Sequence, residues 1–180
     1  WGVGNGTNAS IYLTIGTGVG GGAVLDGNLV HGLSHPEMGH MRVPRHHADA
    51  SFDGVCPFHG DCLEGLASGP AIKARWGVSL SELPSEHPGH DMIAWYLAQA
   101  AATLQAIFEP AKIILGGGVM ETNGLLDRVR VAATQASGKY FTGDPQMLIV
   151  APSLGADAGI LGALALAELL VGETTNIDVN

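Results

Sequence analysis

Between Asp26 and Leu63 the chain is rich in glycine, proline, histidine and aspartate and lacks the apolar spacing of a helix or a strand. A loop of this length inside a compact domain is uncommon, and it needs a cross-link or a function to keep it ordered. Two thiols and two imidazoles within it can supply that cross-link, because they are usual ligands of tetrahedral zinc. These residues are His40, Cys56, His59 and Cys62, in the pattern H-x15-C-x2-H-x2-C.

Four nitrogen and sulfur donors are typical of a closed structural zinc site, whereas a catalytic zinc ion keeps one position open for water. We therefore expect a structural zinc ion that fastens the loop of residues 31–64. Two alternatives stay open: a histidine-rich loop with two free cysteines, or a disulfide between Cys56 and Cys62, which a reducing compartment disfavours. The other histidines are expected to be surface or loop groups: His31, His35, His46, His47, His87 and His90.

Composition excludes several classes of partner. The formal net charge of −9 argues against a nucleic-acid backbone or an anionic membrane, so any phosphate must be bound locally. No run of eighteen apolar residues and no signal-peptide pattern are present, which favours the cytoplasm. The 180 residues suffice for one domain, and the loop-like start at Trp1 leads us to expect a fragment of a longer protein.

The remaining sequence alternates between strand and helix patterns. Apolar runs bounded by glycine predict strands, and apolar residues three or four apart predict helices. This succession predicts a layered α/β domain with right-handed crossovers. The expected strands are residues 11–15, 22–25, 112–115 and 147–151, and the expected helices are residues 91–108, 122–137 and 157–170.

Two glycine turns are candidates for anion binding. In the first, Gly16, Gly18 and Gly20 can present backbone N–H groups to a phosphate, and the Thr17 hydroxyl adds a donor. The second, Gly116-Gly117-Gly118, follows a buried strand and precedes a helix, where anions are favoured. Each also fits a plain structural role, the first as a hairpin turn and the second as a strand-to-helix turn.

Four segments in this order resemble the ROK family of bacterial sugar kinases, and the resemblance extends over essentially all 180 residues. The Cys-x2-His-x2-Cys form is most similar to the fructokinase branch of the family, so fructose is the expected substrate. The segments are Leu13 to Gly22, Pro36-Glu37-Met38-Gly39-His40, the Cys56/His59/Cys62 run and Ile113 to Val119.

The resemblance implies an actin-like ATPase or ribonuclease H-like lobe of a hexokinase-type fold, here the C-terminal lobe over residues 1–180. It implies ATP with Mg²⁺ as cosubstrate, a homodimer, and phosphate contacts at the first glycine turn, with the second turn against the nucleoside. Glu37, His40 and Glu64 match positions that contact the sugar. His40 is thereby expected to serve both zinc and sugar, one ring nitrogen for each.

Phosphoryl transfer to a sugar needs a carboxylate that accepts the hydroxyl proton. The resemblance places this base, with the first phosphate loop, in an N-terminal lobe that precedes Trp1, so we expect no kinase activity from this chain alone. Asp157 opens an apolar helix and is interpreted as its N-cap. On that last helix, Ile160, Leu161 and Leu164 are expected to lack cover. The rival interpretations are a sugar-sensing regulator of the same family and a zinc-stapled interaction module.

Overall fold

The computed structural model describes residues 2–138 and 140–174. Its centre is a five-stranded sheet in the order β3-β2-β1-β4-β5. Strands β1 and β2 form an antiparallel hairpin extended by β3, whereas β4 and β5 run parallel to β1. The strands are β1 (Ala9–Ile15), β2 (Val19–Leu25), β3 (Asn28–Leu29), β4 (Lys112–Gly116) and β5 (Ile149–Val150).

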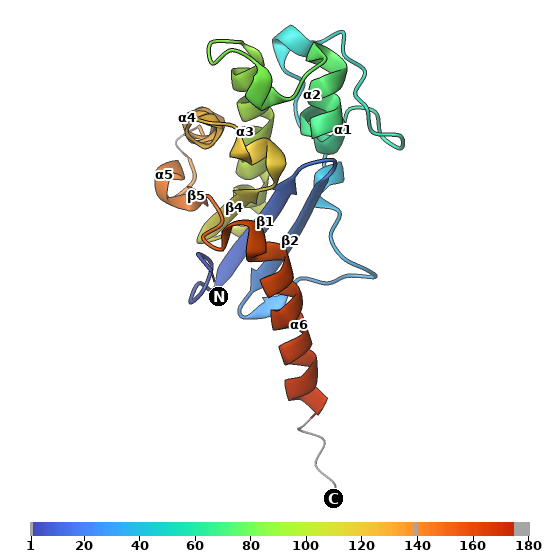
Figure 1. Ribbon diagram of the computed structural model, residues 1–180. Coiled ribbons are helices and arrows are strands. Elements are labelled where there is room, and N and C mark those ends of the chain that lie inside the picture. Colours follow the sequence, from blue (N-terminus) through green and yellow to red (C-terminus); the bar gives the residue numbers. More distant parts are fainter. Residues whose placement is uncertain (1, 139, 175–180) are drawn as a thin grey trace, which may run out of the picture.

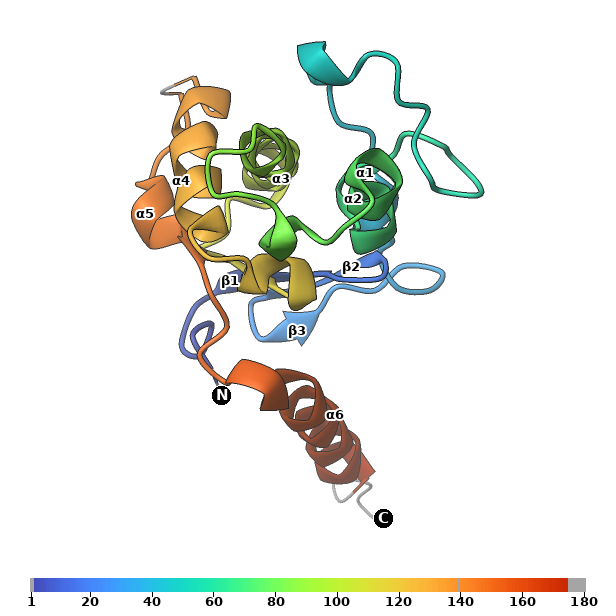
Figure 2. The same ribbon diagram turned by 45° about the horizontal axis from the view of Figure 1, so that its top comes forward.

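Helices cover one face of this sheet (Figure 2), with α3, α4, α1 and α2 on that side and α6 on the other. The side chains of β1 alternate between the two faces of the sheet. Ile11, Leu13 and Ile15 point to the covered face and are fully buried, whereas Thr14 is exposed. The helices are α1 (Leu63–Ala67), α2 (Gly69–Trp76), α3 (Gly89–Phe108), α4 (Leu125–Ala136), α5 (Pro145–Leu148) and α6 (Ala158–Thr174). Short 3₁₀ helices are η1 (Met38–His40), η2 (His47–Asp49), η3 (Leu80–Glu82), η4 (Gly118–Glu121) and η5 (Gly155–Asp157).

The predicted α/β succession is confirmed, with shifts at the element ends. Strand β2 begins at Val19, so the turn is only Gly16-Thr17-Gly18 and Gly20 lies in the strand. The helix expected over residues 122–137 begins only at Leu125, as α4, because Gly124 directly before it adopts φ +74°. Of the strand expected over residues 147–151, only two residues pair, since Asp144 caps the short helix α5 just before it.

A buried ion pair fastens the long loop from its middle. Arg75 on α2 donates to both carboxylate oxygens of Asp49, at 2.9 and 2.7 Å, and both side chains are 5% exposed. The hydroxyl of Tyr96 on α3 donates to the same carboxylate at 2.7 Å. The guanidinium of Arg75 also lies 3.8 Å from the centre of the Phe52 ring. The loop therefore has a polar anchor on α2 and α3 besides the histidine and cysteine group.

His90 departs from the expectation that the remaining histidines are surface or loop groups. It lies in the first turn of α3 and is 4% exposed, with Nε2 at 3.1 Å from the carbonyl oxygen of Pro84. The contact needs a proton on Nε2, and within the described part of the chain its Nδ1 has no hydrogen-bond partner. His90 is thus a buried residue that secures the start of α3.

Helix α6 projects away from the remaining structure (Figure 1). Ile160 and Leu164 are 64% and 51% exposed, as expected from the sequence, whereas Leu161 is half-buried. Asp157 directly precedes α6, at the position of an N-cap. Among the described residues, no helix has the length and apolar character needed to cross a membrane.

Candidate functional site

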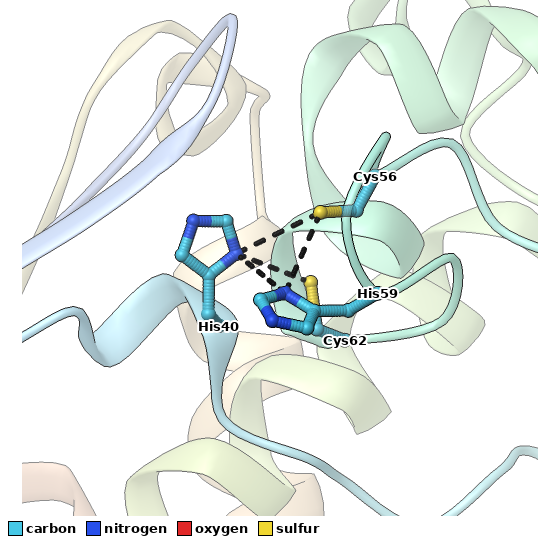
Figure 3. Close-up of side chains that lie close together, drawn as sticks. All are labelled: His40, Cys56, His59 and Cys62. Carbon is cyan, nitrogen blue, oxygen red and sulfur yellow. Dashed lines mark hydrogen bonds between the residues drawn. The ribbon is translucent and has the colours of Figure 1, made fainter.

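The four predicted metal ligands come together in the structure (Figure 3). Nδ1 of His40 lies 3.3 Å from Nδ1 of His59, 3.7 Å from Sγ of Cys56 and 3.5 Å from Sγ of Cys62. Sγ of Cys56 is 3.8 Å from Nδ1 of His59. All four ligand atoms lie within 4.8 Å of one another. The cluster therefore joins His40, in the first half of the loop, to the segment Cys56 to Cys62 at the end of the loop.

The four separations of 3.3 to 3.8 Å agree with the edges of a tetrahedron, and the other pairs of ligand atoms lie within 4.8 Å. A zinc ion with bonds of about 2.3 Å to sulfur and about 2.0 Å to nitrogen places neighbouring ligand atoms about 3.3 to 3.8 Å apart. Both cysteines are free and buried, which is consistent with thiolate ligands and not with the alternative of a disulfide. Burial raises the pKa of the Cys62 thiol, and a metal ion that bound there would displace the thiol proton. The donor set thus fits zinc.

A tight turn presents three of the four ligands. Cys56 and Gly60 form an isolated bridge, with Cys56 N–H to Gly60 O at 3.1 Å and Gly60 N–H to Cys56 O at 2.8 Å. Gly60 adopts φ +62°, a conformation that side chains disfavour. Asp61 accepts from the guanidiniums of Arg42 and Arg45, which hold the turn against the preceding loop. Cys62 then stands at the N-cap position of α1.

The segment that contains His40 lies directly against Val19, the first residue after the first glycine turn. A Cβ atom on Gly39 would stand 1.7 Å from the carbonyl oxygen of Val19, so only glycine permits this approach. Nδ1 of His40 belongs to the metal cluster, and its other ring nitrogen points away from the cluster (Figure 3). The carboxylate of Glu37 is exposed and lies 2.7 Å from Nε2 of His35. One imidazole nitrogen of His40 is thus available to a ligand.

Glu64 in the first turn of α1 reaches the same place from the other side. Its Oε2 accepts a hydrogen bond from the N–H of Val19 at 3.0 Å. Glu64 also lines a pocket of about 340 Å³ together with the predicted phosphate-binding turn. The other lining residues are Thr14, Gly16, Thr17, Gly18, Val19 and Gly20. The structure thereby brings one predicted sugar residue and the first glycine turn into one cavity.

The second glycine turn lies at the same edge of the sheet, where the parallel strands β1 and β4 end, a common location of ligand sites in α/β sheets. Two of its glycines are required by packing. A Cβ on Gly116 would lie 2.4 Å from the hydroxyl of Tyr12, and one on Gly117 would lie 2.4 Å from the carbonyl of Ile15. Only Gly118 has open space around its Cβ position. The turn does not line the pocket of the first turn.

Sequence reasoning missed the buried ion pair and the Glu64 contact. Asp49 and Arg75 are separated by helices and turns, and no motif indicates their pairing. Burial acts to raise the pKa of Asp49, but the hydrogen bonds from Arg75 and Tyr96 outweigh it and hold that pKa below its ordinary value. Burial, with the hydrogen bond to Asp49, raises the pKa of the Tyr96 hydroxyl. The pair is a structural support of the loop.

Comparison with known families agrees with the resemblance seen in these motifs. The ROK family model matches residues 1–169. The chain belongs to the ROK family. It is 50% identical over 170 residues to a fructokinase of Zymomonas mobilis, with 93% of this chain and 56% of that protein covered. A fructokinase of Pediococcus pentosaceus is 41% identical, with 88% of this chain and 55% of that protein covered. The chain therefore spans little more than half the length of these relatives.

Solved structures agree on the fold. The ROK hexokinase of Thermus thermophilus has a TM-score of 0.77 at 28% identity, with 96% of this chain and 61% of that one covered. A ROK family glucokinase of Streptomyces griseus, solved with glucose and AMPPNP, has a TM-score of 0.68 at 26% identity, with coverages of 91% and 62%. The expected fold class, an α/β lobe of the actin-like ATPase type, is confirmed.

Proposed function

We propose that this chain forms the C-terminal, ligand-binding lobe of an ATP-dependent hexose kinase, with fructose as its substrate. One observation carries this proposal: the pocket that Glu64 shares with the glycine turn of Gly16 to Gly18 lies beside the Gly39-His40 segment. A phosphate site and sugar-binding groups are thus neighbours, as transfer between the two ligands requires. Fructokinase relatives at 41% to 50% identity support fructose and favour a kinase over a regulator.

In this proposal the nucleotide phosphates occupy the first glycine turn. The N–H groups of the turn and the Thr17 hydroxyl would donate to phosphate oxygens. Gly20 in β2 lines the same pocket without adding a side chain to it. Mg²⁺, bound with ATP, would neutralise phosphate charge during transfer. At the second turn, the backbone of Gly116, Gly117 and Gly118 would approach the nucleoside, and Gly116 and Gly117 also maintain the packing of β4 against β1.

The sugar would lie beside the metal cluster. Glu37 and Glu64 offer carboxylate oxygens to sugar hydroxyls, and the free ring nitrogen of His40 can donate to another. The metal group His40, Cys56, His59 and Cys62 would hold structural zinc, because four protein ligands leave no position for water. Zinc would then fix the orientation of His40 toward the sugar.

The proton acceptor of the reaction is proposed to lie in the part of the relatives that this chain does not match. Asp157 at the start of α6 is proposed as a helix cap and not as the base.

We further propose a cytoplasmic homodimer. Light scattering of the purified chain tests the dimer, and a monomer at all concentrations would oppose it.

A chimera tests the proposed function. The part of the Zymomonas mobilis fructokinase that this chain does not match would be joined to this chain, and ADP production would be followed with ATP, Mg²⁺ and either fructose or glucose. We expect activity with preference for fructose from the chimera and none from the chain alone. Matched chimeras with Thr17→Val and Glu37→Gln should fold yet lose activity. A folded chimera without activity on either sugar, or an active chain alone, would contradict the proposal.

A further inference from the structure

Val19 is contacted by both segments that carry the metal cluster. Its carbonyl oxygen lies against Gly39, the residue before His40, and its N–H donates to Glu64, the second residue after Cys62. Val19 itself is buried and is the first residue after the turn of Gly16 to Gly18. The backbone N–H and the backbone carbonyl of one residue, Val19, are therefore in contact with two chain segments that a bound metal ion would tie together.

Besides the cluster, the Asp61 carboxylate joins these two segments by accepting from Arg42 and Arg45. The N–H of Leu63 donates to the carbonyl oxygen of Met41 at 3.0 Å, which links the residues just after His40 and Cys62. The α1–α2 junction adds a further tie, since the N–H of Gly69 donates to the carbonyl oxygen of Gly16 at 2.7 Å. The position of α1 and of its junction with α2 thus affects both ends of the turn, and the cluster residue Cys62 is the N-cap of α1.

The carboxylate of Glu64 is divided between two tasks. Oε2 is used by Val19, whereas Oε1 has no hydrogen bond among the described residues. A carboxylate has enough acceptor capacity to hold a backbone N–H with one oxygen and a ligand hydroxyl with the other. A Cβ atom on Gly18 would lie 2.7 Å from Oε2, so the carboxylate rests directly on the turn.

We propose that Glu64 is a positioning residue for the phosphate-binding turn, and that through its bond to Val19 the metal state of the cluster controls how well that turn binds a phosphate. The ligand half of this inference rests on the proposed function. By linkage, the factor by which metal strengthens phosphate binding equals the factor by which phosphate strengthens metal binding. The glycine turn and the metal cluster therefore act as one coupled site.

Amide hydrogen exchange tests the positioning role without any nucleotide. Exchange at Val19 would be followed by NMR in the zinc-loaded and the EDTA-treated chain, with the amides of the β1–β2 ladder as the internal control of folding. Metal removal should speed exchange at Val19 by about tenfold, the effect of losing a charge-assisted hydrogen bond. Unchanged exchange at Val19 with an intact ladder would overturn the proposal.

Two substitutions separate the hydrogen bond from the charge. Glu64→Gln keeps an oxygen that can accept from Val19, so the amide should stay protected in the zinc-loaded chain. Glu64→Ala removes the acceptor, so exchange should be fast with and without metal. Equal exchange in the two variants would refute a specific bond between Glu64 and Val19.

Calorimetry with ADP then tests the coupling. Zinc loading should raise the affinity of the unmodified chain for ADP by about tenfold, a typical coupling between sites, and should have little effect in Glu64→Ala. ADP affinity that is equal in both metal states would refute the coupling and leave the proposed nucleotide site intact. Tighter ADP binding by Glu64→Ala would show mere charge repulsion and also refute it. No ADP binding in any form would count against both the coupling and the proposed function, whereas the exchange result at Val19 would still be decided separately.

Discussion

Arg75 holds both carboxylate oxygens of Asp49 in a pair that water scarcely reaches, since each side chain is 5% exposed. The long loop is thereby attached to α2 at a point between His40 and Cys56. Breaking one partner of such a pair leaves an uncompensated buried charge, which is far more costly than losing a surface ion pair. The loop therefore depends on two chemically different attachments, one ionic and one offered to a metal.

Arg75→Leu should lower the free energy of unfolding by about 3–5 kcal/mol, because the Asp49 carboxylate would stay buried without its cation. The matched control is Arg128→Leu, which breaks the exposed pair of Arg128 and Asp91. That change should cost about 1 kcal/mol or less. Urea denaturation in zinc-loaded buffer measures both, and similar losses in the two variants would contradict the structural role of the buried pair.

Acid should weaken this attachment. The folded chain holds the pKa of Asp49 below its ordinary value of 3.8, with the bonds from Arg75 and Tyr96 outweighing burial. A carboxyl with a depressed pKa stabilises the folded state above its unfolded pKa and loses that contribution as pH falls through the folded value. In EDTA, the stability gap between the unmodified chain and Asp49→Asn should therefore be constant above about pH 5 and shrink toward pH 3. A gap that widens in acid would mean that the sign is wrong.

Gly39→Ala should destabilise the chain by more than about 2 kcal/mol, because the added methyl group meets the carbonyl of Val19 and the backbone must shift. Gly22→Ala is the matched control, since nothing lies within 4 Å of its Cβ position. That substitution should change stability by less than about 1 kcal/mol. Thermal denaturation compares the two, and equal effects would argue against the close approach of η1 to β2.

The metal cluster should bind one zinc ion per chain. Native mass spectrometry should detect that ion in the unmodified chain and in His47→Ala, an exposed histidine outside the cluster. His59→Ala and Cys62→Ser should lose it, and chelation should lower the melting temperature because metal binding adds to folding free energy. Retention of zinc by both ligand variants would exclude this site.

The sequence predicted what local chemistry dictates. The spacing of Cys56, His59 and Cys62 was sufficient for the cluster, since a single turn presents them, and alternating or helical apolar patterns located most elements. Contacts between residues far apart in the chain could not be predicted from the sequence. The pairing of Asp49 with Arg75 depends on how α2 lies across the loop, and a single acidic residue in a loop carries no sign of its partner.

The glycine turns also show the difference between what a local pattern predicts and what depends on contacts between distant residues. Backbone freedom marks a glycine as special but leaves its reason open. Gly16 to Gly18 lie in a pocket, as anion binding requires, while Gly116 and Gly117 are excluded from carrying side chains by Tyr12 and by the backbone of Ile15. The sequence favours a surface or loop position for His90, and the packing of α3 buries it.

Strand β1 pairs with β2 across a three-residue turn, but its other edge pairs with β4, about one hundred residues further along the chain. At ribosomal rates of about 5–20 residues per second, that edge would wait roughly 5–20 s for its partner. For most of this interval the apolar row of Ile11, Leu13 and Ile15 lacks both β4 and α3, so the nascent hairpin is prone to aggregate. The order of the strands thus sets when the chain is vulnerable during its own synthesis.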